Sequence, residues 1–278
     1  MDTIIHFIDV GQGNMVLIEA TDGKFYICDC NVTNDNEDKV LDYLGQTIGW
    51  GTLISAFICT HRDADHMRGI KKIHSFFPIQ SIWDSGYPGT TTNSSEYTDY
   101  MDLRRRVGST EQKRLTRKDL SMTRLRFLSA KDERLDKNAN AQGLVIKVEH
   151  WNSDDIGSSA ILTGDCDAET WKQGILNDYS KSDVKASILM AGHHGSITFF
   201  DEPTDSQYYY LEHMLAIKPD MTVVSVGNNA HGHPDERALE LYEKYTKGSK
   251  KGNKVFTTQV KGTLKLTLKD KGWSLNVV

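Results

Sequence analysis

The sequence predicts an α/β protein whose buried, parallel strands end in polar loops along one edge of a sheet. Short apolar runs bounded by glycine and turn residues recur along the chain, and such runs are typical of strands buried on both faces. Segments of helical character separate several of these runs. Because strands joined through helices tend to run parallel, their carboxyl ends should lie along the same edge.

Five apolar runs are predicted strands. They span residues 25–30, 53–59, 159–163, 186–190 and 221–226. Helices are expected at 168–178, at about 206–217 and at 234–245, the last with Pro234 in its first turn. Polar residues follow these runs and should converge on one crevice, which is the usual site of α/β proteins.

The most informative motif follows the run 53–59. Within six positions it places His61, Asp63, Asp65 and His66. Neutral imidazole and carboxylate are common ligands of zinc, manganese and iron, so the motif indicates a metal site. The alternative is a polar loop in which Asp65 lies near the start of a helix and caps it.

Three further polar clusters stand directly after predicted strands. Asp165 follows the run 159–163. The run 186–190 is followed by His193, His194 and Ser196, and the run 221–226 by Asn228, Asn229, His231 and His233. Residues remote in sequence would thus meet at one point, which favours the metal site over the capping loop.

The order of these motifs resembles the metallo-β-lactamase superfamily. The motifs are His-x-Asp-x-Asp-His, Thr-Gly-Asp, His-His-Gly-Ser and Gly-His-Pro, and they run from His61 to Pro234. The closest branch is the hydrolase domain of the ComEC competence protein, because the turn from Asp9 to Gly13 and the aspartate Asp29 match it too. The resemblance implies a four-layer αββα sandwich, and we expect one domain over residues 1–278.

The ligand types suggest two cations, with Asp165 bridging them. The first would be held by His61, Asp63, Asp165 and one of His193 and His194. The second would be held by Asp65, His66, Asp165 and the other histidine of the pair, or by His233. Two adjacent cations activate water as hydroxide and stabilise charge on the reacting oxygens, so this pattern predicts a hydrolase.

Zinc or manganese are the expected metals, and Asp63 shifts the preference toward manganese or magnesium because it offers oxygen instead of nitrogen. We assign catalytic roles to Asp65, Asp165 and His233. Only one of His193 and His194 is expected to bind metal directly, because adjacent residues leaving a strand point in different directions. Gly195 favours His194.

Polar residues around this centre are candidates for other roles. We expect Asp9 and Asp29 either to orient the ligands or, as loop residues, to accept hydrogen bonds from backbone N–H groups. Contacts to substrate are expected from Arg68, Ser196, Asn228, Asn229 and His231. The four cysteines are expected to pack as small buried hydrophobes.

A basic segment lies in the middle of a mildly acidic chain, whose net charge is −5. It occupies part of an expected insert at about 87–126. The residues predicted to contact a nucleic-acid backbone are Arg104, Arg105, Arg106, Lys113, Arg114, Arg117 and Lys118. The alternative is a solvated helix face with charge pairs.

The predicted activity is metal-dependent hydrolysis of phosphodiester bonds by a nuclease acting on DNA or RNA. One alternative is a small-molecule phosphoesterase, acting on a phosphocholine-type or cyclic nucleotide substrate. Another is a non-catalytic binding module that keeps its metal. No apolar stretch approaches a membrane span and the N-terminus lacks a signal pattern, so we expect a cytoplasmic protein, either alone, as a homodimer or with a partner protein.

Overall fold

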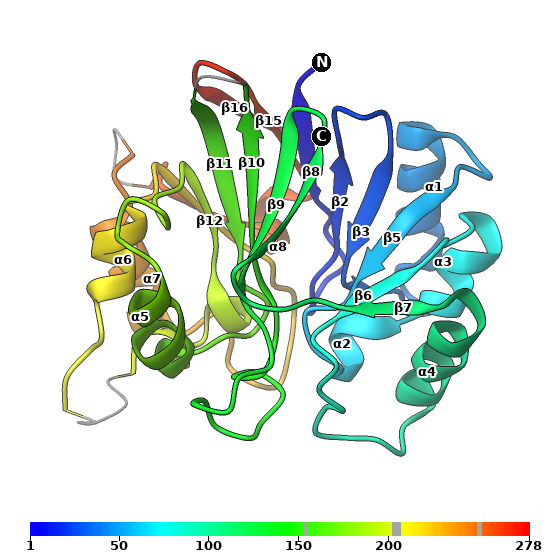
Figure 1. Cartoon of the computed structure of the whole chain (residues 1–278), viewed down its shortest axis with the longest axis horizontal. Coiled ribbons are helices and arrows are strands. Elements are labelled where there is room, and N and C mark those ends of the chain that lie inside the picture. Colours follow the sequence, from blue (N-terminus) through cyan, green and yellow to red (C-terminus); the bar gives the residue numbers. More distant parts are fainter. Residues whose placement is uncertain (153–154, 202–206, 249–251) are drawn as a thin grey trace.

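The computed structural model describes residues 1–152, 155–201, 207–248 and 252–278. Two sheets pack face to face, and helices cover the outer face of each one (Figure 1). Helices α1, α3 and α4 lie on one side and α5, α6 and α7 on the other. The predicted four-layer αββα sandwich is therefore confirmed.

The first sheet has eight strands in the order β16-β15-β1-β2-β3-β5-β6-β7. Strands β3, β5, β6 and β7 run parallel, as expected for strands linked by helices. The bounds are β1 Thr3–Phe7, β2 Val16–Glu19, β3 Phe25–Cys28, β5 Ile54–Ile58, β6 Ile82–Asp84, β7 Ser109–Glu111, β15 Leu264–Leu268 and β16 Trp273–Val277, with β4 Cys30–Asn31 as a short extra strand.

The second sheet has seven strands in the order β14-β13-β12-β11-β10-β9-β8. Strands β11 to β14 are parallel, whereas β8 to β11 form an antiparallel meander. The bounds are β8 Thr116–Leu120, β9 Thr123–Ser129, β10 Val145–Trp151, β11 Ile156–Leu162, β12 Ile188–Met190, β13 Met221–Val224 and β14 Val255–Thr257.

The helices are shorter than the sequence pattern predicted. Their bounds are α1 Glu37–Ile48, α2 Ala64–Met67, α3 Ile70–Phe76, α4 Ser95–Val107, a π-helical turn η1 Thr170–Ile175 leading into α5 Leu176–Asp178, the 3-10 turns η2 Gly192–Gly195 and η3 Ile197–Phe199, α6 Glu212–Ile217, α7 Glu236–Tyr245 and α8 Thr258–Lys261.

Two helix starts differ from the prediction. The helix expected from about 206 begins only at Glu212, and residue 206 itself lies outside the described residues. The helix expected from Pro234 begins at Glu236, because the Asp235 side chain accepts hydrogen bonds from the backbone N–H groups of Arg237 and Ala238. An aspartate in this position is a strong N-terminal cap, so it sets the helix start.

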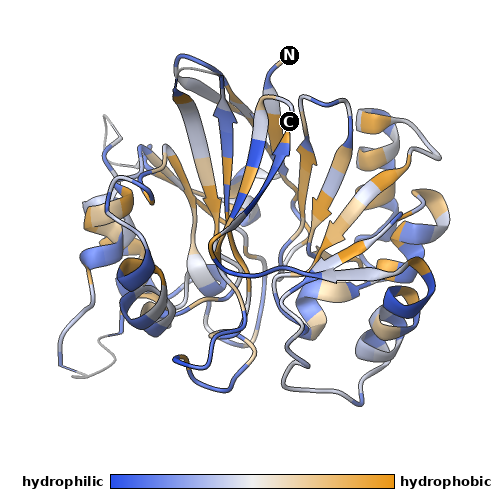
Figure 2. Ribbon diagram, viewed as in Figure 1, coloured by the Kyte–Doolittle hydropathy of each residue, from blue (hydrophilic) through white to orange (hydrophobic). Residues whose placement is uncertain are grey.

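Apolar side chains fill three layers of core. Figure 2 shows hydrophobic residues along the strands of both sheets. Between the sheets, Ile5, Phe7 and Ile18 of the first sheet pack with Phe127, Ile146 and Val223 of the second. The outer faces of the sheets pack on the helices, as Leu44 of α1 and Trp171 of η1 do. Strands covered on both faces must be apolar throughout, which explains the continuous apolar runs.

The expected insert at about 87–126 belongs to the fold itself. It contains α4, β7, β8 and the first residues of β9, so it contributes strands to both sheets. The polar, alternating sequences of β8 and of the hairpin β15–β16 were not predicted as strands. The hairpin lies beside β1 and pairs with it, from Thr3 opposite Leu268 to Phe7 opposite Leu264.

The four cysteines are buried and unpaired, as expected for core residues. Among the helices of the described ranges, none is long and apolar enough to cross a membrane.

His213 should make the fold sensitive to acid. Burial lowers its pKa to about 4 from the ordinary value of 6.5. Its Nε2 donates to the backbone oxygen of Phe199, and its Nδ1 accepts from the N–H of Met214, so the folded state holds a neutral ring. The unfolded chain takes up a proton below about pH 6.5, and the folded chain does not until about pH 4.

The free energy of unfolding should therefore fall by about 2 kcal/mol between about pH 7.5 and pH 5 because of this group alone. The measurement is urea unfolding at both pH values, for the parent and for His213→Gln, which cannot titrate in this range. The parent should lose more stability than the variant. Equal losses would contradict the assignment.

Candidate metal centre

Three loops meet at the lower edge of the sandwich in Figure 1, where α2 follows β5. The β5–α2 loop carries His61 and Asp63, the loop after β11 carries Asp165, and the turn after β12 carries two further histidines. Gly164 allows the loop after β11 to touch the β5–α2 loop, because a Cβ at this position would lie 2.8 Å from the Cβ of Thr60. Its φ of 53° also suits glycine.

The turn from Asp9 to Gly13, the N-terminal turn, packs against α2. Gly13 lies so close to this helix that a Cβ would be 2.7 Å from the backbone oxygen of Asp65. The N–H of Asn14 donates to that same oxygen. Gly227, after β13, approaches equally closely, since its Cβ would lie 2.4 Å from the carbonyl carbon of Gly11. The glycines of this turn therefore serve close backbone packing.

Asp165 stands at the centre of the site and divides its two oxygens between four histidines. Its Oδ1 lies 3.1 Å from Nε2 of His66 and 3.4 Å from Nε2 of His194. Its Oδ2 lies 3.8 Å from Nε2 of His61 and 3.6 Å from Nε2 of His193. One buried carboxylate thus bridges two sets of imidazoles.

Each set also contains an aspartate from the His-x-Asp-x-Asp-His motif. Asp63 Oδ2 lies 3.6 Å from Nε2 of His61, on the Oδ2 side of Asp165. Asp65 Oδ2 lies 3.2 Å from Nε2 of His194, on the Oδ1 side. The two sets match the two ligand groups that the sequence suggested, with His193 in the first and His194 in the second.

The residues fit a pair of metal ions. Within the described residues, several buried atoms that face the centre have no hydrogen-bond partner: Nε2 of His61, His66 and His194, Oδ1 of Asp63 and Oδ1 of Asp165. Buried polar atoms without partners are costly and rare. Divalent cations bound here would supply the missing partners, because nitrogen and carboxylate oxygen are suitable ligands. His61, His66 and Asp165 bring three ligand atoms within 4.8 Å of one another, and so do Asp65, His66 and His194.

Neighbouring groups fix the orientation of two imidazoles. His66 Nδ1 lies 2.8 Å from Oδ2 of Asp29. The Asp29 carboxylate also accepts hydrogen bonds from Thr60, from the backbone N–H at Oδ1 and from the hydroxyl at Oδ2. His194 Nδ1 donates to the backbone oxygen of Ser225 at 3.0 Å. Holding Nδ1 in this way points Nε2 at the metal position and sets the tautomer.

Asp9 takes the second of its two expected roles and accepts a hydrogen bond from a backbone N–H group. One of its oxygens accepts from the N–H of Gly11, and the other pairs with Lys39. Its side chain therefore closes the N-terminal turn and holds α1, which is a structural role.

The electrostatics suit cation binding. Burial, followed by the charge of His66, lowers the pKa of His61 to about 4, so this ring is a neutral ligand near pH 7. Burial acts against the charged form of His194 too, but Asp165 outweighs it and raises the pKa to about 9. A cation entering this set must displace protons, which is usual for metal sites.

The backbone after β12 directs the side chains of both His193 and His194 toward Asp165. We expected only one to face the centre because we assumed an extended backbone. His193 and His194 instead have φ of 48° and 54°, in the left-handed region. The two rings differ in support, because His194 is 2 % exposed and His193 is 27 % exposed with only Thr198 Oγ1 near its Nδ1.

Comparisons with solved structures agree with this architecture. A metal-dependent hydrolase of the β-lactamase superfamily, Tm1679, superposes with a TM-score of 0.56 and 13 % identity, over 95 % of this chain and 98 % of its own. A diphosphatase from the PhnP family superposes with a TM-score of 0.53 and 14 % identity, over 96 % of this chain and 99 % of its own. The chain has the metallo-β-lactamase fold.

A longer enzyme shares this fold. CmlA, a diiron β-hydroxylase from Streptomyces venezuelae, superposes with a TM-score of 0.56 and 14 % identity over 96 % of this chain. The chain spans only 54 % of the length of CmlA. No protein-family model matches the sequence, and no curated protein matches it. The closer resemblance to the ComEC hydrolase domain stays a prediction.

The loop after β13 lies at the rim of the candidate metal centre, beside His193. The ring of His233 lies 5.3 Å from that of His193, and the described residues give it no carboxylate partner. The Asn229 amide shapes this loop, because it bonds the backbone of Gly227, His231 and His233. His231 is exposed and stacks on His233.

Three other predicted substrate contacts are engaged within the fold. Arg68 donates to Glu96 Oε1 at 3.0 Å and to Asn31 Oδ1 at 2.9 Å, so it ties α2 to α4. Ser196 Oγ accepts hydrogen bonds from Thr198, and Asn228 Oδ1 accepts one from Gln259.

The basic segment forms charge pairs in part. Arg104 donates to Asp84, which is 2 % exposed, so this arginine is a fold residue and not a surface clamp. Arg114 pairs with Asp132 and Asp178. Arg105 forms an ion pair with Asp102 and Arg117 with Asp119, and Lys118 lies over the Trp83 ring. Arg106 and Lys113 are exposed.

Several residues that line an opening beside the centre were not identified from the sequence. A cavity of about 200 Å³ adjoins Asp63 and His193 and is lined also by Thr90, Asn138, Asn140 and Asp167. Thr90 belongs to the segment 87–126 that was expected to be an insert. The polar run 136–140 could have been noticed, since it contains two asparagines and an aspartate between two strands.

A second cavity, of about 430 Å³, shares Asp167 and Thr198 with the first. Its walls are acidic and include Asp136, Glu169 and Asp201. Burial and the nearby Asp136 raise the pKa of Glu169 to about 7, which reflects the density of negative charge. The approach to the centre is therefore acidic on this side.

Replacing Asp165 should remove both metal sites at once. Asp165→Ala deletes the carboxylate whose two oxygens face both histidine sets, so metal content should fall by most of both equivalents. Elemental analysis after purification without chelator checks this, with His74→Gln as a control that touches none of the ligands. Retention of two metal equivalents in Asp165→Ala would disprove the bridging role.

The two adjacent histidines should contribute unequally. His194→Ala should lower metal affinity further than His193→Ala, because the His194 ring is buried and fixed by Ser225, and ligands held in this way bind more tightly. Competition with a chromogenic chelator measures both variants. A larger loss in His193→Ala would reverse the assignment.

Proposed function

We propose that the chain is a metal-dependent hydrolase that cleaves a phosphoester bond in a small molecule. The observation that carries the proposal is the division of the Asp165 carboxylate between two sets of histidine and aspartate side chains. Two divalent cations bound by these sets would polarise a phosphoryl group and lower the pKa of water.

The protein's own residues would prepare the reaction by holding the ligands in place. Asp29 and Ser225 fix His66 and His194 through their Nδ1 atoms, so little reorganisation is needed. His233 stands at the open rim. Burial and the charges of His193 and His194 lower its pKa, so its ring is neutral near pH 7 and can accept a proton there.

Two features support a small substrate over a polymer. The cavity beside His193 is about 200 Å³, which is enough for a phosphoryl group and a small alcohol. The neighbouring acidic walls around Asp136 and Glu169 would repel a polyanion. The arginines that would hold a nucleic acid are partly used within the fold, as Arg104 is by Asp84.

Nuclease activity, which the sequence first suggested, is the second candidate. The basic side chains of Arg105 and Arg106 on α4, Lys113 in the loop before β8 and Arg117 on β8 are exposed. Such side chains could neutralise backbone phosphates, because each neutralised phosphate releases counterions.

The experiment that tests the proposal is hydrolysis of bis(p-nitrophenyl) phosphate by the purified chain with Mn, Mg and Zn in turn. His61→Ala should reduce kcat/KM by roughly a hundredfold or more, as expected when a metal ligand is lost. His74→Gln should match the parent. If the parent binds two metals but cleaves no phosphoester, a non-catalytic metal-containing module becomes the better description.

A matched experiment separates small from polymeric substrates. Arg105, Arg106 and Arg117 are changed together to glutamate, and both the chromogenic diester and linear, circular and single-stranded DNA are assayed at several salt concentrations. We expect unchanged diester turnover, and no DNA cleavage by parent or variant. DNA cleavage by the parent that is lost in the variant, with a flatter salt dependence, would favour the nuclease.

A further inference from the structure

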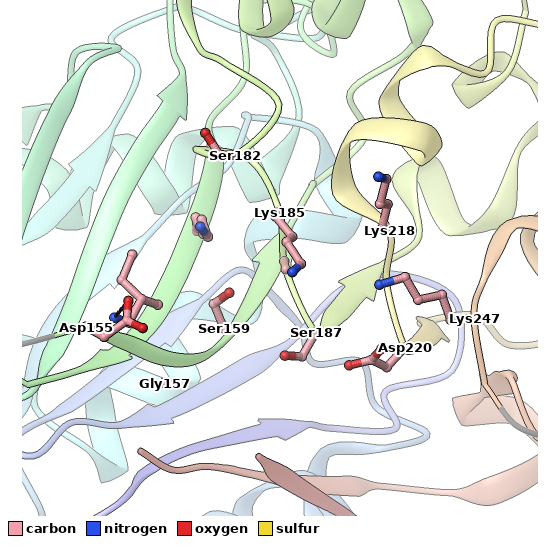
Figure 3. Close-up of a pocket in the computed structure, with 12 residues that line it drawn as sticks. Asp155, Gly157, Ser159, Ser182, Lys185, Ser187, Lys218, Asp220 and Lys247 are labelled. Carbon is pink, nitrogen blue, oxygen red and sulfur yellow. Dashed lines mark hydrogen bonds between the residues drawn. The ribbon is translucent and has the colours of Figure 1, made fainter. Parts of the chain in front are cut away.

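A further cavity, separate from the two beside the metal centre, lies at the opposite edge of the second sheet, where strands β11 to β13 begin (Figure 3). Its volume is about 410 Å³, within the range of small-molecule sites. The candidate metal centre uses the carboxyl ends of these same strands, so the two sites are separated by the length of the sheet. This cavity is not part of the proposed catalytic function.

Three lysines enter the cavity, one from each helix-to-strand connection. Lys185 lies between α5 and β12, Lys218 between α6 and β13, and Lys247 between α7 and β14. All three are exposed, and none of them has an ion-pair partner among the described residues. Three unpaired lysines from three separate loops concentrate positive charge at one place.

The floor of the cavity is polar. Ser159 and Ser187 lie there, and their hydroxyls bond no other side chain or backbone group among the described residues. Lys147 beneath them is 2 % exposed and is neutralised by Glu149 Oε1 at 3.0 Å. The hydroxyls are therefore free to donate to a ligand, whereas Lys147 is not.

Two carboxylates stand at the sides. Asp220 Oδ2 accepts a hydrogen bond from Nε1 of Trp273 at 3.2 Å, and Asp155 Oδ1 accepts one from the N–H of Ile156. Each keeps a second oxygen that can accept from a ligand hydroxyl. The cavity thus offers cations and hydroxyls for an anion and carboxylates for hydroxyl groups.

The backbone at Lys218 favours a role for its side chain. This residue ends α6 with φ of 51° and ψ of 54°, a left-handed conformation that glycine or asparagine normally takes. A lysine there costs about 1 kcal/mol compared with glycine. A residue retained at such a cost is a candidate for function.

We propose that this cavity binds a phosphorylated small molecule with free hydroxyl groups, of the size of a sugar phosphate. Lys185, Lys218 and Lys247 would bind the phosphate, and Ser159 and Ser187 would donate to it. Asp155 and Asp220 would accept hydrogen bonds from the hydroxyls. Charge-assisted hydrogen bonds of this kind are the strong ones, so phosphate should dominate affinity.

The test is calorimetric titration of the whole protein with ribose 5-phosphate, inorganic phosphate and ribose. Ribose 5-phosphate should bind more tightly than phosphate, and ribose should not bind. Lys185→Gln with Lys247→Gln should weaken binding by roughly tenfold or more. Lys24→Gln with Lys131→Gln, two exposed lysines outside the cavity, should bind like the parent.

Two further variants locate the ligand. Lys218→Gly should weaken binding while leaving the fold as stable or more stable, since glycine suits this backbone. His61→Ala should bind as the parent does, because the metal centre is not involved. Loss of binding in His61→Ala, unchanged binding in the Lys185/Lys247 variant, or no preference for ribose 5-phosphate over ribose would each overturn the proposal.

Discussion

The buried carboxylate of Asp165 is the constraint on which the rest of the site depends. A charge that is only 5 % exposed must be compensated, and four imidazoles from two other loops surround it. Those loops can reach it only because Gly164 and Gly13 permit backbone contact without a Cβ. The packing of the two sheets therefore serves to hold three loop ends within a few ångströms of one carboxylate.

Much of the fold and of the centre could be predicted because the signals were local. Continuous apolar runs such as 53–59 identified strands covered on both faces, and polar residues after them, such as His61 and Asp165, marked one edge. The antiparallel strands β8 and β15 escaped notice because one face or edge is solvated, and their alternating polar residues resemble loops.

The remaining details depend on conformation and tertiary partners, which residue types alone do not reveal. The left-handed backbone at His193 and His194 turned two side chains the same way, against the alternation of a strand. The roles of Arg68 and Arg104 were set by Glu96 and Asp84, which lie well apart from them in the sequence. A run of basic residues does not indicate which carboxylates will form ion pairs with it in the folded chain.

The pairing of β1 with β15 also bears on how the chain is made. Residues 3–7 leave the ribosome well before residues 264–268, which cover their edge. Until residues 264–268 are made, β1 presents an unpaired edge, which other chains could join. The first sheet cannot be completed before then, so co-translational folding must proceed with this strand open.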